Sequence, residues 1–369
     1  MKEHTNRLSS YRAAGVDVER EEKALSRLIE TASQTFAFVR DIGQPVLPIG
    51  FFANVIDIGH GTGLALSTDG VGTKIIIAQM MQKYDTLGID CVAMNANDVL
   101  CVGARPISFL DYIAVQEANP DLLDQLMRGL KEGARLASVA ICGGEIAQVR
   151  EMIASEREGW GFDLVGMCVG HVPLGRLIIG REVTPGDVVI GIRSSGIHSN
   201  GLTLARRVLF GQQQYTVDTR FAELGRTLGE ELLEPTSIYV PEVMEAIEGG
   251  LSIKGLAHIT SDGLLNLLRL NPEQADIGYV IDQLPPIPSI FSLIQRSGNL
   301  PDEEMFRVFN MGIGFCAVLS ESDADAFQAI VKRHGRESMP IGHVVSDPEQ
   351  KVVIRPYGLA GKGSSFHKA

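Results

Sequence analysis

Apolar side chains recur along this chain with two periods, one typical of helices and one typical of strands. Near the N-terminus, helical spacing spans residues 17–38, where Leu25 and Leu28 lie on one apolar stripe. A stretch rich in glycine and proline follows at 43–63 and predicts a loop. We therefore expect an N-terminal arm and loop at residues 1–63.

From residue 64 onward, apolar runs of strand length alternate with longer helical patterns, which predicts sheets covered by helices. A turn at Pro185-Gly186 separates two such series and marks a domain boundary. The first series predicts strands at 64–68, 107–115, 139–142 and 162–172, and helices at 86–102 and 120–137. The second predicts strands at 188–192, 277–281, 312–319 and 341–345 and one ending at 258, and helices at 199–210, 236–248 and 323–334 and one opening at 262.

The chain has 369 residues, which is enough for two domains with sizeable cores. The order of elements predicts an α+β fold of two α/β-type domains, each with a mixed sheet and helices. We expect the first domain at 64–180 and the second at 181–360. A flexible tail is expected at 361–369, which is rich in glycine, serine and lysine.

Charge and cysteine content narrow the class of protein. The formal net charge is -12, and neither half has a long run of lysine and arginine, so nucleic acid and acidic membrane surfaces are not expected partners. No uncharged stretch reaches the ~18 apolar residues that a membrane helix needs. The five cysteines show no CxxC spacing, so we expect buried, reduced thiols in a cytoplasmic protein.

The stretch STDGVGTK, residues 67–74, places an acid, two glycines and a lysine directly after an apolar strand. Glycines let the backbone approach a ligand, Asp69 can hold a hard cation, and Lys74 can contact phosphate oxygens. The spacing differs from the common P-loop. A plain hairpin turn with solvated charges is the alternative.

A second isolated acid, Asp98, lies on a predicted helix in CVAMNANDVLCVGA, residues 91–104. At helical spacing its face also carries Cys91 and Asn95, which are small and uncharged. Burying an unpaired carboxylate costs several kcal/mol of folding free energy. Asp98 is therefore either a hydrogen-bonded structural acid or a metal ligand, and the second isolated acid at Asp69 favours a metal.

A third acid, Glu145, follows Gly143 and Gly144 at the expected end of a strand. Three carboxylates, Asp69, Asp98 and Glu145, would suit Mg²⁺, which prefers oxygen ligands and bridges phosphates. A structural role for Glu145, as a cap or as an arginine partner, is the alternative.

The stretch SSGIHSNG, residues 194–201, lies between a predicted strand and a predicted helix. Its hydroxyls, glycines and the coming helix N-terminus are typical of an anion-holding turn, with Ser199 or Asn200 as a cap. His198 could contact a substrate phosphate or transfer a proton, although a single histidine is more often structural.

Together these stretches resemble the aminoimidazole ribonucleotide synthetase family, also called phosphoribosylformylglycinamidine cyclo-ligases. The resemblance covers nearly the whole chain, from Tyr11 to about Pro356. It rests on eight ordered motifs: YRAAGVD at 11–17, DGVGTK at 69–74, GIDCVAMNANDVLCVGARPISFLDY at 88–112, GGE at 143–145, SSGIHSNG at 194–201, LLEPTSIYV at 232–240, AHIT at 257–260 and FNMGIGF at 309–315.

The resemblance implies a purine-biosynthesis ligase. Such an enzyme uses ATP and Mg²⁺ to close formylglycinamidine ribonucleotide into 5-aminoimidazole ribonucleotide through a phosphorylated amide, releasing ADP and phosphate. It also implies a homodimer whose N-terminal halves join through their sheets near the ATP sites. The alternatives are another ATP-dependent small-molecule kinase or synthetase of the superfamily, and a non-catalytic nucleotide-binding paralogue.

By resemblance, each motif residue takes an expected role. Metal ligands would be Asp69, Asp98 and Glu145, and catalytic residues Lys74 and His198. Nucleotide would also contact Gly70, Val71, Gly72, Thr73, Lys74, Asn95 and Gly144, and substrate would contact Ser195, Gly196, His198, Ser199 and Asn200. Three stretches depart from the family pattern: IGFFANV at 49–55, SDG at 261–263, and IAQVREM at 146–152, where Gln148 replaces a second acid.

Overall fold

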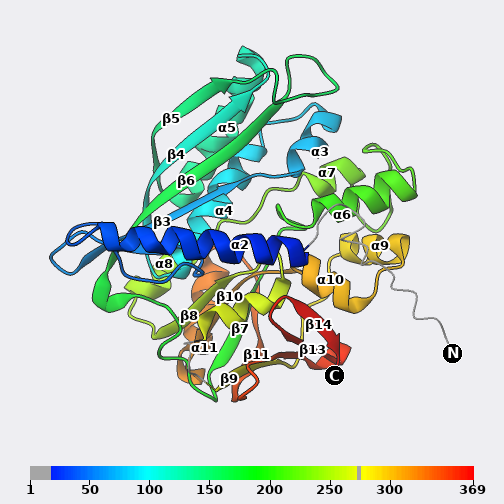
Figure 1. The fold of residues 1–369 in the computed structure, drawn as a ribbon. Coiled ribbons are helices and arrows are strands. Elements are labelled where there is room, and N and C mark those ends of the chain that lie inside the picture. The colour runs from blue at the N-terminus through cyan, green and yellow to red at the C-terminus, as the bar shows by residue number, and fades with distance from the viewer. Residues whose placement is uncertain (1–17, 272–275) are drawn as a thin grey trace.

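The computed structural model describes residues 18–271 and 276–369, with side chains from residue 23, and contains two mixed β-sheets with helices (Figure 1). The predicted fold class of two α/β-type domains is confirmed. The motif at 11–17 lies outside the described residues. Within them, no helix is long and apolar enough to cross a membrane.

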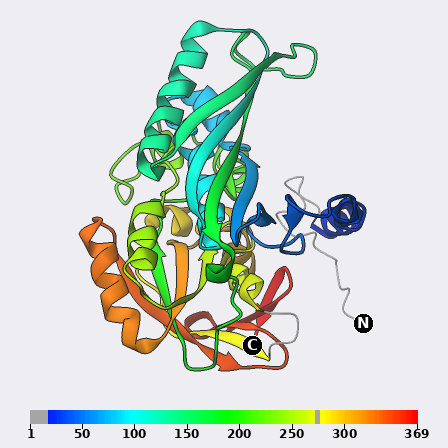
Figure 2. The same ribbon diagram turned by 90° about the vertical axis from the view of Figure 1, so that its left-hand side faces the viewer.

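The expected N-terminal helix is present as α2 (Val18–Ser33), which continues into the 3-10 helix η1 (Gln34–Phe38). Viewed end-on in Figure 2, α2 lies beside the body of the protein. The expected loop at 43–63 instead contains two short strands, β1 (Gln44–Pro45) and β2 (Asn54–Asp57), which join the first sheet. Its residues therefore belong partly to the first sheet rather than wholly to an arm.

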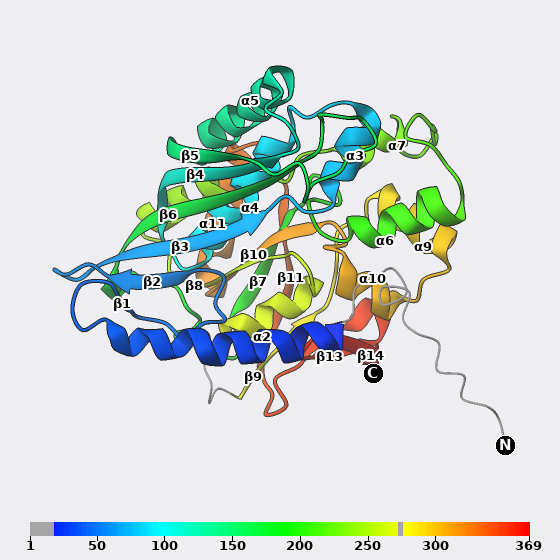
Figure 3. The ribbon, with the colours of Figure 1, turned by 45° about the horizontal axis from the view of Figure 1, so that its top comes forward.

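The first sheet has the strand order β1-β2-β3-β6-β4-β5, which Figure 3 shows along its length. Its four long strands are β3 (Thr62–Gly70), β4 (Arg105–Val115), β5 (Ala140–Gln148) and β6 (Phe162–Pro173). Among the described strands of this sheet, only β4 and β5 run parallel to each other. The helices of this half are α3 (Lys74–Met81), α4 (Leu87–Cys101), α5 (Pro120–Ala137) and the 3-10 turn η2 (Leu174–Arg176).

One face of this sheet is covered by helices. Helix α4 packs on β3 and β6, and α5 packs on α4. Close packing between these helices requires small residues, because a Cβ on Gly88 would lie 2.0 Å from the Leu130 nitrogen. The amphipathic α5 begins where Asn119 accepts hydrogen bonds from two backbone N–H groups and Pro120 occupies the first turn.

The opposite face of the sheet is exposed and carries large apolar side chains. They lie on β4 and β6 and are Ile107, Leu110, Tyr112 and Met167, each 37–44% exposed. Strand β5 is exposed or half-buried along its whole length and forms an edge of the sheet. An apolar face of this kind is typical of a protein interface.

The second sheet has the order β14-β13-β12-β9-β11-β7-β10-β8. Its strands are β7 (Val188–Arg193), β8 (Ile253–His258), β9 (Ile277–Ile281), β10 (Ile313–Leu319), β11 (Ser338–Ser346), β12 (Val352–Ile354), β13 (Leu359–Lys362) and β14 (Ser365–Lys368). The α-helices are α6 (Leu202–Arg206), α7 (Leu228–Leu232), α8 (Val240–Glu248), α9 (Ser289–Gly298), α10 (Asp302–Val308) and α11 (Glu321–Arg333). Other helical turns are the π-helix η3 (Arg207–Gln212) and the 3-10 helices η4 (Gly263–Leu270) and η5 (Arg355–Tyr357).

The prediction of a flexible tail at 361–369 is wrong, because these residues form most of the β13–β14 hairpin. Phe366 is only 6% exposed and lies edge-on to Phe306, with ring centroids 6.5 Å apart. One buried aromatic ring therefore anchors a segment whose glycine, serine and lysine content suggested disorder.

Candidate functional site

The DGVGTK stretch forms the end of β3, a turn and the first residue of α3. The Asp69 carboxylate accepts a hydrogen bond of 2.7 Å from the Gly70 N–H. Gly72 has a φ of 68°, a left-handed conformation that favours glycine, and a Cβ there would meet no atom within 4 Å. Thr73 reaches the other half of the chain, with its hydroxyl 3.1 Å from that of Thr203. This turn therefore opens onto free space at Gly72 and joins the two halves at Thr73.

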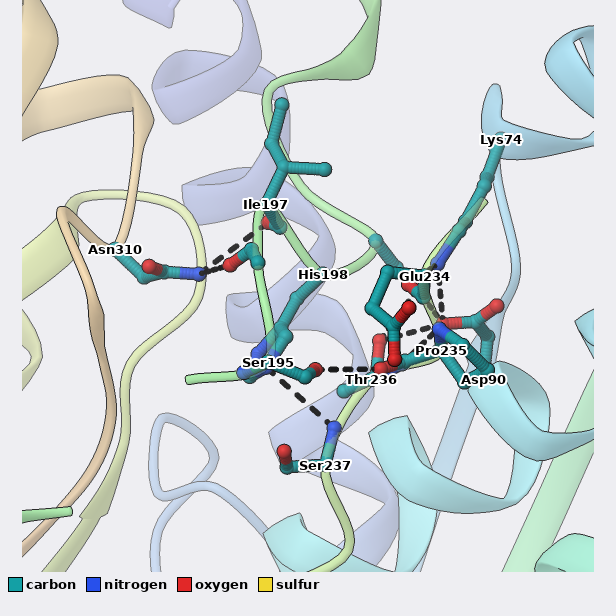
Figure 4. Close-up of polar contacts among 12 residues, drawn as sticks. Lys74, Asp90, Ser195, Ile197, His198, Glu234, Pro235, Thr236, Ser237 and Asn310 are labelled. Atoms are coloured by element: carbon teal, nitrogen blue, oxygen red, sulfur yellow. Dashed lines mark hydrogen bonds and ion pairs between the residues drawn. The ribbon is translucent and has the colours of Figure 1, made fainter. Parts of the chain in front are cut away.

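Lys74 does not project from this turn, because its side chain is fully buried (Figure 4). The Nζ donates to Oδ1 of the equally buried Asp90 at 2.8 Å and to the Glu234 carbonyl at 2.6 Å. The same Asp90 oxygen accepts from the backbone N–H and the hydroxyl of Thr236, at 2.8 and 2.6 Å. Lys74 and Asp90 thus form a buried ion pair that ties α3 and α4 to the segment before α8.

Asp69 lies at the end of β3 and Asp98 on the neighbouring helix α4, near enough for the charge of Asp98 to act on Asp69. The pKa of Asp69 is raised, mainly by burial and next by the negative charge of Asp98. Asp98 accepts a hydrogen bond of 2.9 Å from Nδ1 of His258, a fully buried residue at the end of β8. The Asp98 side chain itself is 18% exposed and Asp69 is half-buried, so neither carboxylate is sealed from solvent.

Glu145 does not join this acidic pair within one chain. It is exposed on the edge strand β5 and pairs with Tyr112 on β4. Tyr112 in turn pairs with Val165 on β6, and Val165 pairs with Gly70 on β3. Three strand spacings separate Glu145 from Gly70, about 14 Å for strands about 4.8 Å apart. Among the described residues, no group of three acidic, histidine or cysteine side chains could hold a metal.

The other two nucleotide-side candidates have structural contacts. Asn95 is fully buried, and its amide nitrogen donates to the carbonyls of Asp69 and Cys91 at 3.1 and 2.8 Å. It therefore fixes the end of β3 to α4. A Cβ on Gly144 would lie 2.8 Å from Asp111, so glycine is needed where β5 passes β4.

The SSGIHSNG stretch lies against the segment that contains Thr236, as Figure 4 shows. The Ser199 hydroxyl lies 3.1 Å from that of Thr236 and 3.3 Å from Asp90 Oδ1, so this loop shares the buried ion pair. The Gly196 carbonyl accepts from Asn310 at 3.0 Å. The Asn200 amide nitrogen donates to the Ser261 hydroxyl at 3.0 Å, in the SDG stretch that differs from the family pattern. Among the described residues, the buried Asn200 Oδ1 has no hydrogen-bond partner.

His198 is buried inside this loop in a left-handed conformation, with a φ of 64°. Its Nε2 accepts from the backbone N–H groups of Ser195 and Ser237, at 3.2 and 3.4 Å. Burial above all, and then nearby His258 and Lys74, lower its pKa well below the ordinary value of 6.5. The ring is therefore neutral and holds two loop backbones together.

Sequence patterns missed three residues that build this site: Asp90, His258 and Asn97, whose side-chain oxygen accepts from the Tyr239 N–H at 3.0 Å. Asp90 and Lys74 are charges in otherwise apolar runs, and such pairs of isolated opposite charges indicate a buried ion pair. His258 ends an apolar strand in the AHIT motif, which carried the family resemblance but no assigned role. Its partner lies 160 positions away, so no local pattern joins the two.

Two sequence families match this chain. Residues 52–172 match the AIR synthase related protein, N-terminal domain, and residues 184–355 match the AIR synthase related protein, C-terminal domain. Fold and sequence thus place the chain in the AIR synthase related class.

A relative from Thermococcus kodakarensis, named phosphoribosylformylglycinamidine cyclo-ligase, is 46% identical over 351 residues, which are 95% of this chain and 99% of the relative. This chain therefore belongs to the phosphoribosylformylglycinamidine cyclo-ligase family, which confirms the resemblance drawn from the motifs.

Solved structures share the fold at low sequence identity. Thiamine-monophosphate kinase from Stenotrophomonas maltophilia has a TM-score of 0.59 and 19% identity, over 87% of this chain and 93% of that chain. Hydrogenase maturation protein HypE in complex with ATP has a TM-score of 0.56 and 20% identity, over 79% of this chain and 81% of that chain. At these identities the likeness concerns the fold alone.

Proposed function

We propose that this protein closes the imidazole ring of 5-aminoimidazole ribonucleotide, using ATP and formylglycinamidine ribonucleotide, in purine biosynthesis. The observation that carries the proposal is near full-length similarity to relatives named phosphoribosylformylglycinamidine cyclo-ligase. The close pair Asp69 and Asp98 supports it, because a magnesium–ATP reaction needs acidic ligands. The five cysteines form no disulfide, and all but the exposed Cys142 are buried, which supports a cytoplasmic location.

In the proposed reaction, the formyl amide oxygen attacks the γ-phosphorus of ATP, and ADP leaves. The amide carbon then carries a phosphate leaving group and is electrophilic. The substrate's own amidine-side nitrogen attacks this carbon and closes the ring, and the C–O bond breaks. The former amide oxygen departs with phosphate, so the products are aminoimidazole ribonucleotide, ADP and phosphate.

Asp69 and Asp98 are the residues that would hold Mg²⁺. The donor set fits, because Mg²⁺ is commonly bound by one or two carboxylates together with substrate phosphates. When bound, the ion would neutralise phosphate charge during transfer. Burial first, and then the negative charge of Asp98, raise the pKa of Asp69, and a divalent ion bound beside it would favour its ionised form.

The turn from Gly70 through Val71 and Gly72 to Thr73 would hold the phosphates of ATP. Open space at Gly72 and its left-handed backbone support this role. Asn95 would act by holding the end of β3 in place. Lys74 is enclosed by Asp90 and the Glu234 carbonyl, so we propose that it positions this turn rather than touching phosphate.

On the substrate side, we propose that Ser195, Gly196, Ser199 and Asn200 line the binding loop. The buried, unpartnered Asn200 Oδ1 supports an acceptor role toward a substrate N–H or O–H group. His198 is enclosed and neutral, so we propose that it shapes this loop through Ser195 rather than transferring a proton.

We propose that the protein is a homodimer in which a second copy covers the exposed apolar face of the first sheet. Glu145, with Gly144 beside it, lies three strands from the acidic pair, and β2 pairs with β3 only at Gly63–Leu66. In the described residues, the Asp69 end of β3 is therefore an open edge on that side. A second copy that covers this face and extends to this edge would bring its own Glu145 toward Asp69 and Asp98.

The activity test measures ADP and aminoimidazole ribonucleotide by mass spectrometry, with Mg–ATP and with or without formylglycinamidine ribonucleotide. Equal amounts of both products, formed only with the substrate, are expected. Intact ATP beside a folded protein that binds ATP would refute the proposal and indicate a non-catalytic paralogue. ATP use with a different small molecule alone would indicate another enzyme of the superfamily.

Subunit mixing tests whether Glu145 acts from the second copy. Asp98→Asn and Glu145→Gln should each strongly lower the activity of the homodimer at low magnesium. Co-expression should restore part of the activity, because one of the two sites in each mixed dimer then has both acids intact. No recovery in mixed dimers, isolated with two different tags, would place both acids in the same chain's site.

A further inference from the structure

A histidine at the end of a strand of the second sheet contacts Asp98, one member of the acidic pair. His258 ends β8, whereas Asp98 lies on α4, which packs on the first sheet. The imidazole is fully buried, and its ring lies 6.3 Å from that of Phe315, measured between ring centroids. Its Nδ1 lies 2.9 Å from Asp98 Oδ1. Within the described residues, Asp98 Oδ2 makes no hydrogen bond, so one oxygen is held and the other is open.

The hydrogen-bond network fixes which nitrogen of His258 carries the proton. A backbone N–H can only donate, so Tyr239 N–H, 3.0 Å from the Asn97 side chain, identifies the Asn97 oxygen. The Asn97 nitrogen then donates to the Ser237 carbonyl at 2.9 Å and faces His258 Nε2 at 3.4 Å. His258 Nε2 therefore accepts and Nδ1 donates to Asp98.

We propose that His258 is a positioning residue that orients Asp98 for the magnesium–ATP complex. The proposal rests on the proposed function and adds a residue that acts through Asp98 without touching the nucleotide. Hydrogen bonds to a ligating carboxylate fix its orientation, and their loss typically weakens metal binding or activity by about 10-fold to 100-fold. Because His258 and the Asn97 contacts belong to the second half of the chain, the packing of the two halves sets the geometry of the metal-binding carboxylate.

Two substitutions at His258 separate the loss of the hydrogen bond to Asp98 from the loss of the imidazole ring. His258→Asn places an N–H group where Nδ1 lies and keeps the contact to Asp98. His258→Gln has no donor at that position and loses the contact. In both variants Asn97 keeps its hydrogen bond to the Ser237 carbonyl. His343→Gln is the matched control, because it removes another histidine–carboxylate contact, to Asp282 at 2.8 Å on the surface.

The assay compares two affinities of the intact protein for a non-hydrolysable ATP analogue. One is measured with the Mn²⁺ complex, by water proton relaxation, and the other without metal in the presence of EDTA, by calorimetry. We expect His258→Gln to weaken binding of the Mn²⁺ complex about tenfold and to leave metal-free binding unchanged. His258→Asn and His343→Gln should keep the wild-type ratio of the two affinities.

The outcomes distinguish the inference from the proposed function. If the wild-type protein binds the Mn²⁺ complex and forms product, but His258→Gln keeps the wild-type ratio of the two affinities, the inference alone is overturned. Equal weakening with and without metal would also overturn it, since that result indicates general damage to the site. Wild-type nucleotide binding that is indifferent to Mn²⁺ would remove both the metal site and this inference.

A measurement on the wild-type protein does not depend on whether a variant folds. Histidine ¹⁵N chemical shifts distinguish the two neutral imidazole tautomers. The His258 signal is assigned by its loss in His258→Asn or through the backbone. We expect it to show a protonated Nδ1 and an unprotonated Nε2. A neutral ring protonated at Nε2 would contradict the proposed donation to Asp98.

Discussion

Replacing Lys74 with methionine tests whether this lysine is a structural cation. Lys74 and Asp90 are both fully buried, with 2.8 Å between Nζ and Oδ1. Methionine fills a similar volume without the charge. In Lys74→Met, the Asp90 carboxylate keeps its two hydrogen bonds from Thr236 and loses its only cation among the described residues.

Breaking a buried ion pair by removing one partner typically costs about 3–5 kcal/mol. Because Thr236 still stabilises the carboxylate, we expect the lower end, a loss of about 3 kcal/mol in the free energy of unfolding. This is a large share of the roughly 5–15 kcal/mol that stabilises a typical domain. Adding Asp90→Asn should restore most of the loss, because the remaining buried group is then neutral.

The assay is equilibrium urea unfolding without nucleotide, followed by the fluorescence of Trp160. This is the only tryptophan in the chain, and it stacks on Tyr84 in the first half with ring centroids 5.2 Å apart. A loss below about 1 kcal/mol, as for an exposed pair, would refute the buried-pair reasoning. Unchanged stability with weakened ATP binding would instead support direct contact of Lys74 with phosphate.

Three further predictions concern the acids, the loop histidine and the exposed sheet face. Asp98→Asn should raise the magnesium concentration needed for ADP formation while leaving the thermal unfolding curve intact; unchanged turnover at low magnesium would remove Asp98 from the metal site. Because the pKa of His198 is lowered on folding, the unfolded chain binds a proton below about pH 6.5 that the native protein does not. His198 should therefore reduce stability by about 1.4 kcal/mol for each pH unit below that value. His198→Gln keeps an acceptor for Ser195 and should abolish this slope in urea unfolding between pH 5 and 7; an identical slope would contradict the neutral ring. Leu110→Asp should convert a dimer to monomers in light scattering and abolish activity; a monomeric wild-type protein would refute the proposed interface.

Local patterns were enough to place many elements of this fold. Helix α5 occupies the predicted residues 120–137, and β9 the predicted 277–281. In each case the apolar period and the flanking turn residues act within a few positions of the element itself. The hairpin β13–β14 was missed because residues 361–369 are mostly polar or glycine, and Phe366 is their one buried large apolar side chain.

The sequence by itself determined the family, because ordered motifs over nearly the whole chain identify it. It also singled out Asp69 and Asp98, since isolated acids in apolar surroundings need a partner or a ligand. The tertiary structure alone decided the partners: Asp90 for Lys74 and His258 for Asp98.

The distance between Glu145 and the acidic pair follows from the order of strands in the sheet. In space, β6 and β4 lie between β3 and β5, whereas in the chain β6 comes after both β4 and β5. Sequence spacing shows what each residue can do, but the distance between residues far apart in the chain is set by strand order and by the packing of the two halves. The charges at this site are therefore paired by contacts that no local pattern contains.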